Sequence, residues 1–135
     1  MGFSTNHLVS WGDCDALGIV FYPNFFSWMD GAFHQLTRHL GFDQDTLNSD
    51  YQIAGTPLSS ADCKFLSPAH YYETLSINIE TSDLSRTSWK LNYRFQCEER
   101  GIAVGAERRV FVADVNGKLQ KTDIPDELRR KILEI

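Results

Sequence analysis

Two carboxylates separated by a single residue are the part of this sequence best placed to do chemistry. Asp13 and Asp15 lie in the loop Gly12–Gly18, which is bounded by glycine and directly precedes a predicted helix. A carboxylate can act as a nucleophile or as a general base. We expect the two side chains to have different roles. One would accept loop N–H groups or form a salt bridge, and the other would face a cavity.

The start of the predicted helix offers the complementary group. Pro23 suits the first helical position, because its φ is preset and its missing N–H would be unpaired there. The unpaired N–H groups and the positive end of the helix dipole favour an anion at this point. Pro23 has no donor, so the N–H of Tyr22 or of a neighbour would meet a developing oxyanion. A carboxylate opposite such a donor would catalyse acyl transfer. The competing interpretation is structural, because acidic residues before helices commonly serve as caps.

The loop is followed by a long apolar helix, which must hold it in position. Its apolar residues recur at three- and four-residue steps from residue 22 to residue 40, and Gly41 is the expected stop. An aromatic acyl group could pack against Phe25, Phe26 or Trp28, but we expect these three side chains to be core residues in the first place, because the apolar face of a helix must be buried. The predicted apolar face comprises Tyr22, Phe25, Phe26, Met29, Phe33, Leu36 and Leu40.

Strands are expected to wrap this helix. Alternating side chains and turn residues predict five strands, an irregular stretch over 42–55 and a short last helix over 125–135. The short spacers favour antiparallel neighbours, because parallel pairs need long crossovers. The predicted strands are 3–11, 58–66, 73–82, 88–97 and 102–115.

These elements predict an α+β domain spanning residues 1–135, in which a five-stranded antiparallel sheet wraps one long central helix. The length fits a single domain. The helix is apolar over more than a narrow stripe, so we expect a second subunit to cover the surface that its own sheet leaves open.

Composition narrows the class of protein. The 13 Lys and Arg residues against 18 Asp and Glu residues give a formal net charge of −5, which argues against nucleic-acid binding. No apolar run is long enough to cross a bilayer, and the N-terminal residues do not resemble a secretory signal. The three widely spaced cysteines predict neither a disulfide framework nor a zinc site, so we expect a cytoplasmic protein.

The segment Gly12–Asn24, followed by Trp28-Met29-Asp30, resembles the signature of hotdog-fold acyl-CoA thioesterases. The resemblance is strongest to the 4-hydroxybenzoyl-CoA thioesterase branch, which uses a catalytic aspartate, and it includes Gly55-Thr56-Pro57. It covers essentially the whole chain and weakens after about Ser67.

The resemblance implies a role for each matching residue. Asp15 matches the catalytic carboxylate, and Tyr22 matches the residue whose backbone N–H polarises the thioester carbonyl. Asp30 and Thr56 match positions that line the acyl pocket. The resemblance also implies a homotetramer, a dimer of dimers with active sites at subunit interfaces. It implies no metal and no bound cofactor, since coenzyme A enters only as part of the substrate.

Coenzyme A carries phosphates, so basic side chains must hold it. Arg86 lies in the turn where the family places basic phosphate contacts, although this turn is poorer in Arg and Lys than the family pattern. A solvated sheet edge is an equally good explanation for the remaining basic candidates. These are Arg108, Arg109, Lys118 and Lys121.

We therefore expect a thioesterase that hydrolyses an aromatic or other small acyl-CoA. Two alternatives stay open: a thioesterase for short aliphatic acyl-CoA or acyl-carrier-protein substrates, and a non-catalytic acyl-CoA-binding module. A dehydratase of the same fold is disfavoured, because no histidine lies in the loop or at the helix start. A nucleophilic role for Cys14 is also disfavoured, because flanking carboxylates suppress its thiolate.

Overall fold

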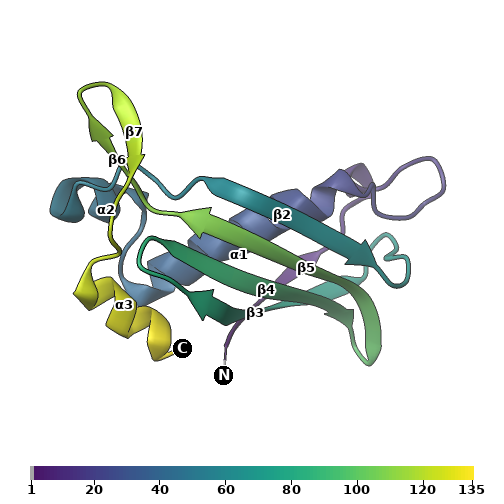
Figure 1. Cartoon of the computed structure of the whole chain (residues 1–135). Coiled ribbons are helices and arrows are strands. Elements are labelled where there is room, and N and C mark those ends of the chain that lie inside the picture. The colour runs from purple at the N-terminus through teal and green to yellow at the C-terminus, as the bar shows by residue number, and fades with distance from the viewer. Residues whose placement is uncertain (1) are drawn as a thin grey trace.

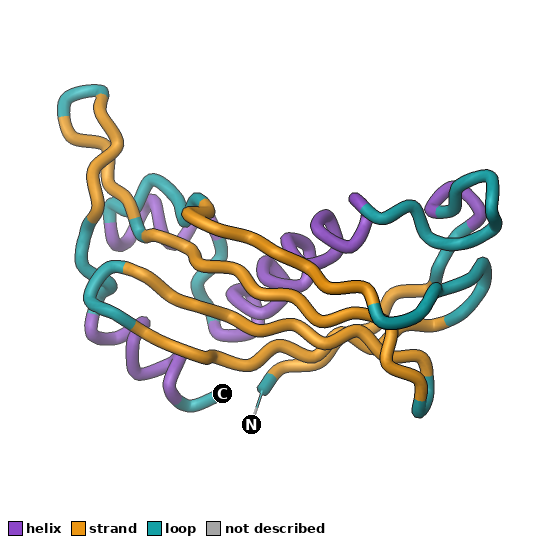
Figure 2. The backbone as a smooth tube through the Cα atoms, turned by 45° about the vertical axis from the view of Figure 1, so that its right-hand side comes forward, coloured by secondary structure: helices purple, strands orange, loops and turns teal. Residues whose placement is uncertain are grey.

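A computed structural model describes residues 2–135, and it contains a five-stranded sheet with one long helix packed across a face (Figures 1 and 2). Every neighbouring pair of strands is antiparallel. The predicted hotdog architecture, α+β with a five-stranded sheet around a central helix, is confirmed. In sheet order the strands are β1 (Phe3–Leu8), β3 (Thr74–Leu84), β4 (Ser88–Cys97), β5 (Arg100–Val110) and β2 (Leu58–Phe65).

The central helix, α1 (Pro23–Leu40), begins and ends where the sequence predicts. Tyr22 is its N-cap, and Gly41 ends it with a φ of 89°, a left-handed conformation that glycine adopts at little cost. The prediction is wrong for the Tyr22 side chain, which is 60% exposed because it precedes the part of the helix that the sheet covers. The buried residues of α1 are Phe25, Met29, Ala32, Phe33, Leu36 and Thr37.

Two segments differ from the prediction. The stretch expected to be irregular contains the short helix α2 (Gln44–Tyr51), whose N-cap Asp43 accepts the Thr46 N–H at 3.0 Å. The last predicted strand is two strands, because the chain leaves the sheet near Phe111 and forms the projecting hairpin of β6 (Val112–Val115) and β7 (Lys118–Lys121). A C-terminal helix, α3 (Asp126–Leu133), follows (Figure 1). No helix within residues 2–135 has both the length and the apolar character needed to cross a membrane.

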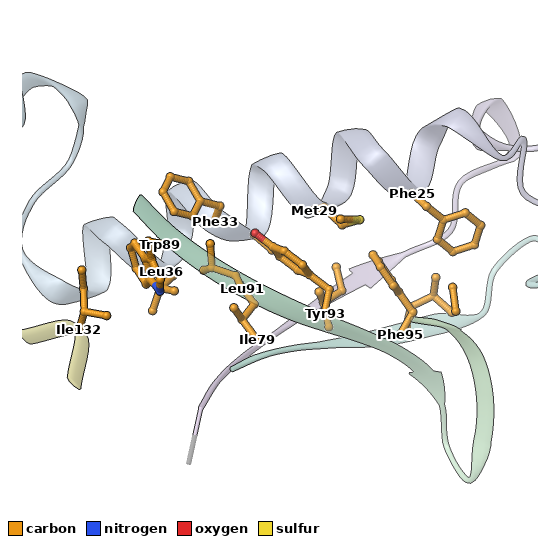
Figure 3. Packing of buried hydrophobic residues seen from close by; sticks show 14 of the residues in the cluster. Phe25, Met29, Phe33, Leu36, Ile79, Trp89, Leu91, Tyr93, Phe95 and Ile132 are labelled. Carbon is orange, nitrogen blue, oxygen red and sulfur yellow. The ribbon is translucent and has the colours of Figure 1, made fainter. Parts of the chain in front are cut away.

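The core lies between α1 and the inner face of the sheet (Figure 3). Phe25 meets Phe95 edge to face at 5.1 Å between ring centroids, and Phe33 meets Trp89 at 5.4 Å. Gly105 of β5 lies beneath the helix where a side chain has no room. A Cβ at Gly105 would lie 2.8 Å from Met29 Sδ and 3.0 Å from a backbone oxygen of β2.

We predict that Gly105→Ala lowers the free energy of unfolding by about 1–3 kcal/mol, because the added methyl group overpacks the contact between helix and sheet. Chemical denaturation at neutral pH measures the difference. Gly31→Ala is the matched control, because a Cβ there meets nothing within 4 Å. In the exposed middle of α1 this control should gain about 1 kcal/mol from helix propensity. An unchanged or raised stability for Gly105→Ala would contradict the packing described.

Candidate active site

Asp13 anchors the acidic loop to the body of the protein. Its carboxylate oxygen Oδ2 accepts the Ser10 N–H at 2.9 Å and lies 2.9 Å from Nε2 of His7 on β1. The His7 ring packs against Trp28 of α1 in a tilted arrangement, with 4.2 Å between ring centroids. Burial works to raise the pKa of Asp13, but the hydrogen bonds from Ser10 and His7 outweigh it and hold the pKa below its usual value. Asp13 therefore takes the structural role predicted for one of the two carboxylates.

Asp15 begins a tight turn that separates it from Asp13. Its backbone N–H donates to Ile19 O at 2.9 Å, and its carbonyl accepts the Gly18 N–H at 3.0 Å. The side-chain Oδ1 accepts the Leu17 N–H at 2.8 Å, and the side chain is exposed. Gly18 has a φ of 78°, which glycine supplies without strain. The turn thus presents the Asp15 carboxylate at the surface of a single chain.

The loop is fastened on its other side to the segment before β3. Val20 N–H donates to Ala69 O at 2.9 Å, and Ile19 forms an isolated bridge with His70. Glu73 accepts the His70 N–H at 2.7 Å and pairs with Arg100. The acidic loop is therefore held between two parts of the fold and has little freedom to move independently of them.

An apolar cleft of about 330 Å³ lies beside the start of α1. The Phe21 N–H donates to Asp13 O at 2.9 Å and the Asn24 side chain to the same oxygen at 2.8 Å, which fixes the first turn. Within residues 2–135 no hydrogen bond engages the Tyr22 N–H, so this donor is available at the helix tip. The cleft is lined by Ile19, Val20, Tyr22, Phe25, Phe65, Leu66, Ser67, Pro68 and Ala69.

Asp15 does not line this cleft in one chain. The predicted juxtaposition of an acid with the helix tip is therefore present only in part: the cleft and Tyr22 lie together, and the carboxylate is nearby in sequence but turned toward solvent. The acidic loop and the helix tip do lie at the same end of the molecule (Figure 1).

A second polar group gathers at the middle of α1. Asp30 Oδ1 accepts from Nη2 of Arg109 at 2.9 Å, and Nη1 of Arg109 lies 3.4 Å from the carbonyl oxygen of Thr56. Glu107 also pairs with this guanidinium at 3.1 Å. Asp30 and Thr56, the two residues expected to line an acyl pocket, thus contact the same guanidinium group, that of Arg109.

Burial makes this second group unusual. Arg109 is 4% exposed and Glu107 is 2% exposed. The hydroxyl of Tyr93 donates to Glu107, and burial together with that carboxylate raises the pKa of Tyr93 well above its usual range. Sequence reasoning missed the role of these residues. The sequence did contain a signal for their burial. Glu107 and Arg109 follow Gly105 at two-residue steps, and side chains at such steps lie on the same face of a strand, here the inner face of β5.

The basic candidates for coenzyme A divide into different environments. Arg109 is buried, so it is wrong as a candidate for a phosphate contact. The alternative explanation, a solvated sheet edge, also fails for Arg109, because β5 lies between β4 and β2. Arg108 is held by Ser88 at 2.8 Å. Arg86 is exposed and pairs with Asp123. The turn between β3 and β4, which carries Arg86, lies at the other end of the sheet from the start of α1 (Figure 1). Lys118 and Lys121 are exposed on the projecting hairpin.

A family model described as the thioesterase-like superfamily matches residues 9–132. The chain belongs to the thioesterase-like superfamily. The prediction of a thioesterase with the hotdog fold is therefore confirmed at the level of family and enzyme class.

Relatives and solved structures agree with this placement. The 4-hydroxybenzoyl-CoA thioesterase of Pseudomonas sp. (strain CBS-3) is 27% identical over 124 residues, 87% of each chain. A 1,4-dihydroxy-2-naphthoyl-CoA hydrolase of Prochlorococcus marinus subsp. pastoris is 27% identical over 128 residues, which cover 92% of this chain and 84% of that protein. The structure of a gentisyl-coenzyme A thioesterase superposes with a TM-score of 0.83 at 34% identity, covering 97% of this chain and 99% of that one.

We predict that Asp13→Asn lowers the free energy of unfolding of this thioesterase by about 1–2 kcal/mol at pH 7, because it removes a charged hydrogen-bond acceptor. The lowered pKa sets the sign of the pH dependence. Ionised Asp13 contributes stability above its unfolded pKa of about 3.9, and this contribution disappears as pH falls through the lower native pKa. Urea unfolding at pH 7 and near pH 3 measures the difference between the two proteins.

Asp15→Asn is the control for this prediction, because its exposed side chain accepts only the Leu17 N–H. Its stability should stay within about 0.5 kcal/mol of wild type. An effect of Asp13→Asn that does not shrink in acid would mean that the ionised carboxylate held by Ser10 and His7 is not its cause.

Proposed function

We propose that this thioesterase hydrolyses an aromatic acyl-CoA to a free acid and coenzyme A, with Asp15 as the essential carboxylate. The observation that carries the proposal is the Tyr22 N–H at the start of α1, which no hydrogen bond from residues 2–135 engages and which lies beside an apolar cleft. A backbone N–H at a helix N-terminus stabilises negative charge on a carbonyl oxygen. The acidic loop that carries Asp15 lies at the same end of the molecule.

Two routes are open to Asp15. As a nucleophile, its carboxylate oxygen attacks the thioester carbon, the C–S bond breaks, and coenzyme A leaves as a thiolate. Water then hydrolyses the resulting anhydride. As a general base, Asp15 accepts a proton from water while the water oxygen attacks the same carbon. The C–S bond then breaks, and coenzyme A leaves as a thiolate that takes up the proton from Asp15. In both routes the Tyr22 N–H stabilises the developing oxyanion, and the proposal needs no cofactor beyond the coenzyme A of the substrate.

An aromatic acyl group is supported by the relatives and by α1. The relatives act on hydroxyaryl thioesters, as their names state. Tyr22, Phe26 and Asp30 follow at four-residue steps along the side of α1 that its own sheet leaves at least partly exposed. Eight residues of helix span about 12 Å, which suits an aromatic acyl group with a hydrogen bond of about 3 Å at each end. We place its ring along this row, with Asp30 and Thr56 at the far end.

We also propose a homotetramer, a dimer of dimers, with the active sites between subunits. Strand β2 is an eight-residue sheet edge, and seven of its residues are exposed. Such an edge pairs readily with another strand. A neighbouring chain over α1 would enclose Asp15 and the cleft in one site. Arg86 would then reach a coenzyme A phosphate bound at a neighbouring subunit's helix tip, because the turn that carries Arg86 lies at the other end of the molecule from the tip of α1, a helix about 27 Å long. Cytoplasmic location remains an expectation.

We expect Asp15→Asn to lower kcat for the preferred acyl-CoA by about 10²–10⁴-fold while substrate binding is retained. Free-thiol release over a panel of aromatic and short aliphatic acyl-CoAs measures turnover, and calorimetry with a non-hydrolysable thioether analogue measures binding. Asp45→Asn on α2 makes the same chemical change at the opposite end of the molecule and should leave kcat unchanged (Figure 1).

Three other outcomes of this experiment would each contradict a different part of the proposal. Preferential turnover of aliphatic thioesters would replace the aromatic substrate class. Binding of coenzyme A without turnover of any thioester by wild type would favour a non-catalytic binding module. Full activity of Asp15→Asn would end the aspartate mechanism.

The assembly has its own test. Ala61 lies in the middle of the exposed edge of β2. Ala61→Pro should block strand addition at that edge, because proline lacks an N–H and its ring obstructs a partner strand. Native mass spectrometry should show a shift from tetramer toward smaller species, dimer or monomer, together with loss of thioesterase activity. Leu119→Ser on the projecting hairpin is the control and should leave the mass unchanged. A wild-type monomer with full activity would contradict the proposal.

A further inference from the structure

A buried ion network beneath the middle of α1 has no part in the two catalytic routes. Its charged members are Arg109 and Glu107, which are 4% and 2% exposed, and Asp30, whose side chain is 54% exposed. Removing such charges from water costs several kcal/mol for each ion, and hydrophobic residues of similar volume often serve a core equally well. A network of this kind therefore suggests a function beyond stability.

Arg109 is the hub of the network, and its guanidinium is held on every side. Its Nε and Nη2 lie 3.1 Å from the two carboxylate oxygens of Glu107, and Nη2 also lies 2.9 Å from Asp30 Oδ1. Nη1 faces the Thr56 carbonyl at 3.4 Å. The Phe33 ring lies 3.9 Å from the guanidinium carbon. A planar fork with five donors can satisfy these acceptors together, and a lysine ammonium cannot.

This arrangement leaves one oxygen of Asp30 available. Oδ1 is engaged by Arg109 and lies 3.5 Å from His34 Nε2, whereas no residue between 2 and 135 contacts Oδ2 with a hydrogen bond. The side chain is half exposed on the open side of α1. Asp30 therefore presents a single acceptor in a fixed direction.

We propose that Arg109, locked by Glu107 and Tyr93, is a positioning residue that makes the enzyme selective for hydroxylated aromatic acyl groups. By holding Oδ1, it aims Oδ2 of Asp30 at a hydroxyl on the acyl ring, which donates to it. This inference rests on the proposed function, since it needs an aryl thioester bound along α1. A ring without the hydroxyl leaves the Asp30 oxygen without a partner once the ligand excludes water, and that loss creates the selectivity.

The test compares substrates that differ by one hydroxyl. The quantity measured is the ratio of kcat/KM for 3- or 4-hydroxybenzoyl-CoA, whichever is faster, to kcat/KM for benzoyl-CoA. A hydrogen bond to a charged group predicts a wild-type ratio of about 10–100. In Arg109→Lys and in Asp30→Asn this ratio should fall about tenfold, because the loss falls mainly on the hydroxylated substrate. Arg94→Lys, on the outer face of the sheet, is the matched control and should keep the wild-type ratio.

A second variant guards against misfolding. Glu107→Gln keeps the side-chain volume and leaves Arg109 in place but weakens its lock, so the ratio should fall in the same direction by a smaller factor. Equal losses for both substrates in every variant, with the ratio unchanged, would reduce the network to a structural role and overturn the inference.

Failure of the inference and failure of the proposed function give different results. Wild type that hydrolyses no aryl thioester would remove the proposed function and this inference with it. Wild type that hydrolyses hydroxylated and unsubstituted rings equally well would leave the proposed function standing and overturn the selectivity argument alone.

Discussion

The burial of α1 against a five-stranded sheet is the constraint on which the rest of the structure depends. The sheet covers one side of the helix from Phe25 onward, and the tip at Tyr22 remains at the surface. The N–H groups of a helix tip cannot be satisfied within the helix itself. A rigid, half-buried helix thus presents a fixed hydrogen-bond donor beside an apolar cleft, and this is the arrangement that the proposed thioester chemistry requires.

Two groups of charged side chains lie along α1, and within each group the less exposed residue has a structural role. Near the helix tip, Asp13 uses its charge to fasten the acidic loop to β1, which leaves Asp15 without a structural duty beyond its own turn. Farther along the helix, Arg109 is enclosed by acceptors and holds Asp30. In the first group a partly buried carboxylate holds the loop that carries the more exposed Asp15, and in the second a buried arginine holds the more exposed Asp30. This division is how a fold keeps functional side chains oriented without burying them completely.

The acidic loop, the helix boundaries and most strands could be predicted from the sequence because their signals are local. Pro23 and Gly41 mark the ends of α1 through their own backbone preferences, and the alternation in β4 follows from one buried face. The predictions that failed concern segments whose secondary structure or exposure depends on contacts with residues far away in the sequence. The short helix after Asp43 has little apolar periodicity, and Tyr22 reads as part of an apolar face until the sheet is seen to end short of it.

The sequence by itself determined the fold class, the superfamily and the location of the acidic loop before the helix, because these depend on patterns within a few residues. Only the tertiary structure decided which charges are buried. Arg109 reads as one more basic residue in the sequence, yet β5 places it under α1 between Glu107, Asp30 and Thr56. Long-range pairing sets that environment, because residues 79 positions apart meet only when the sheet closes over the helix.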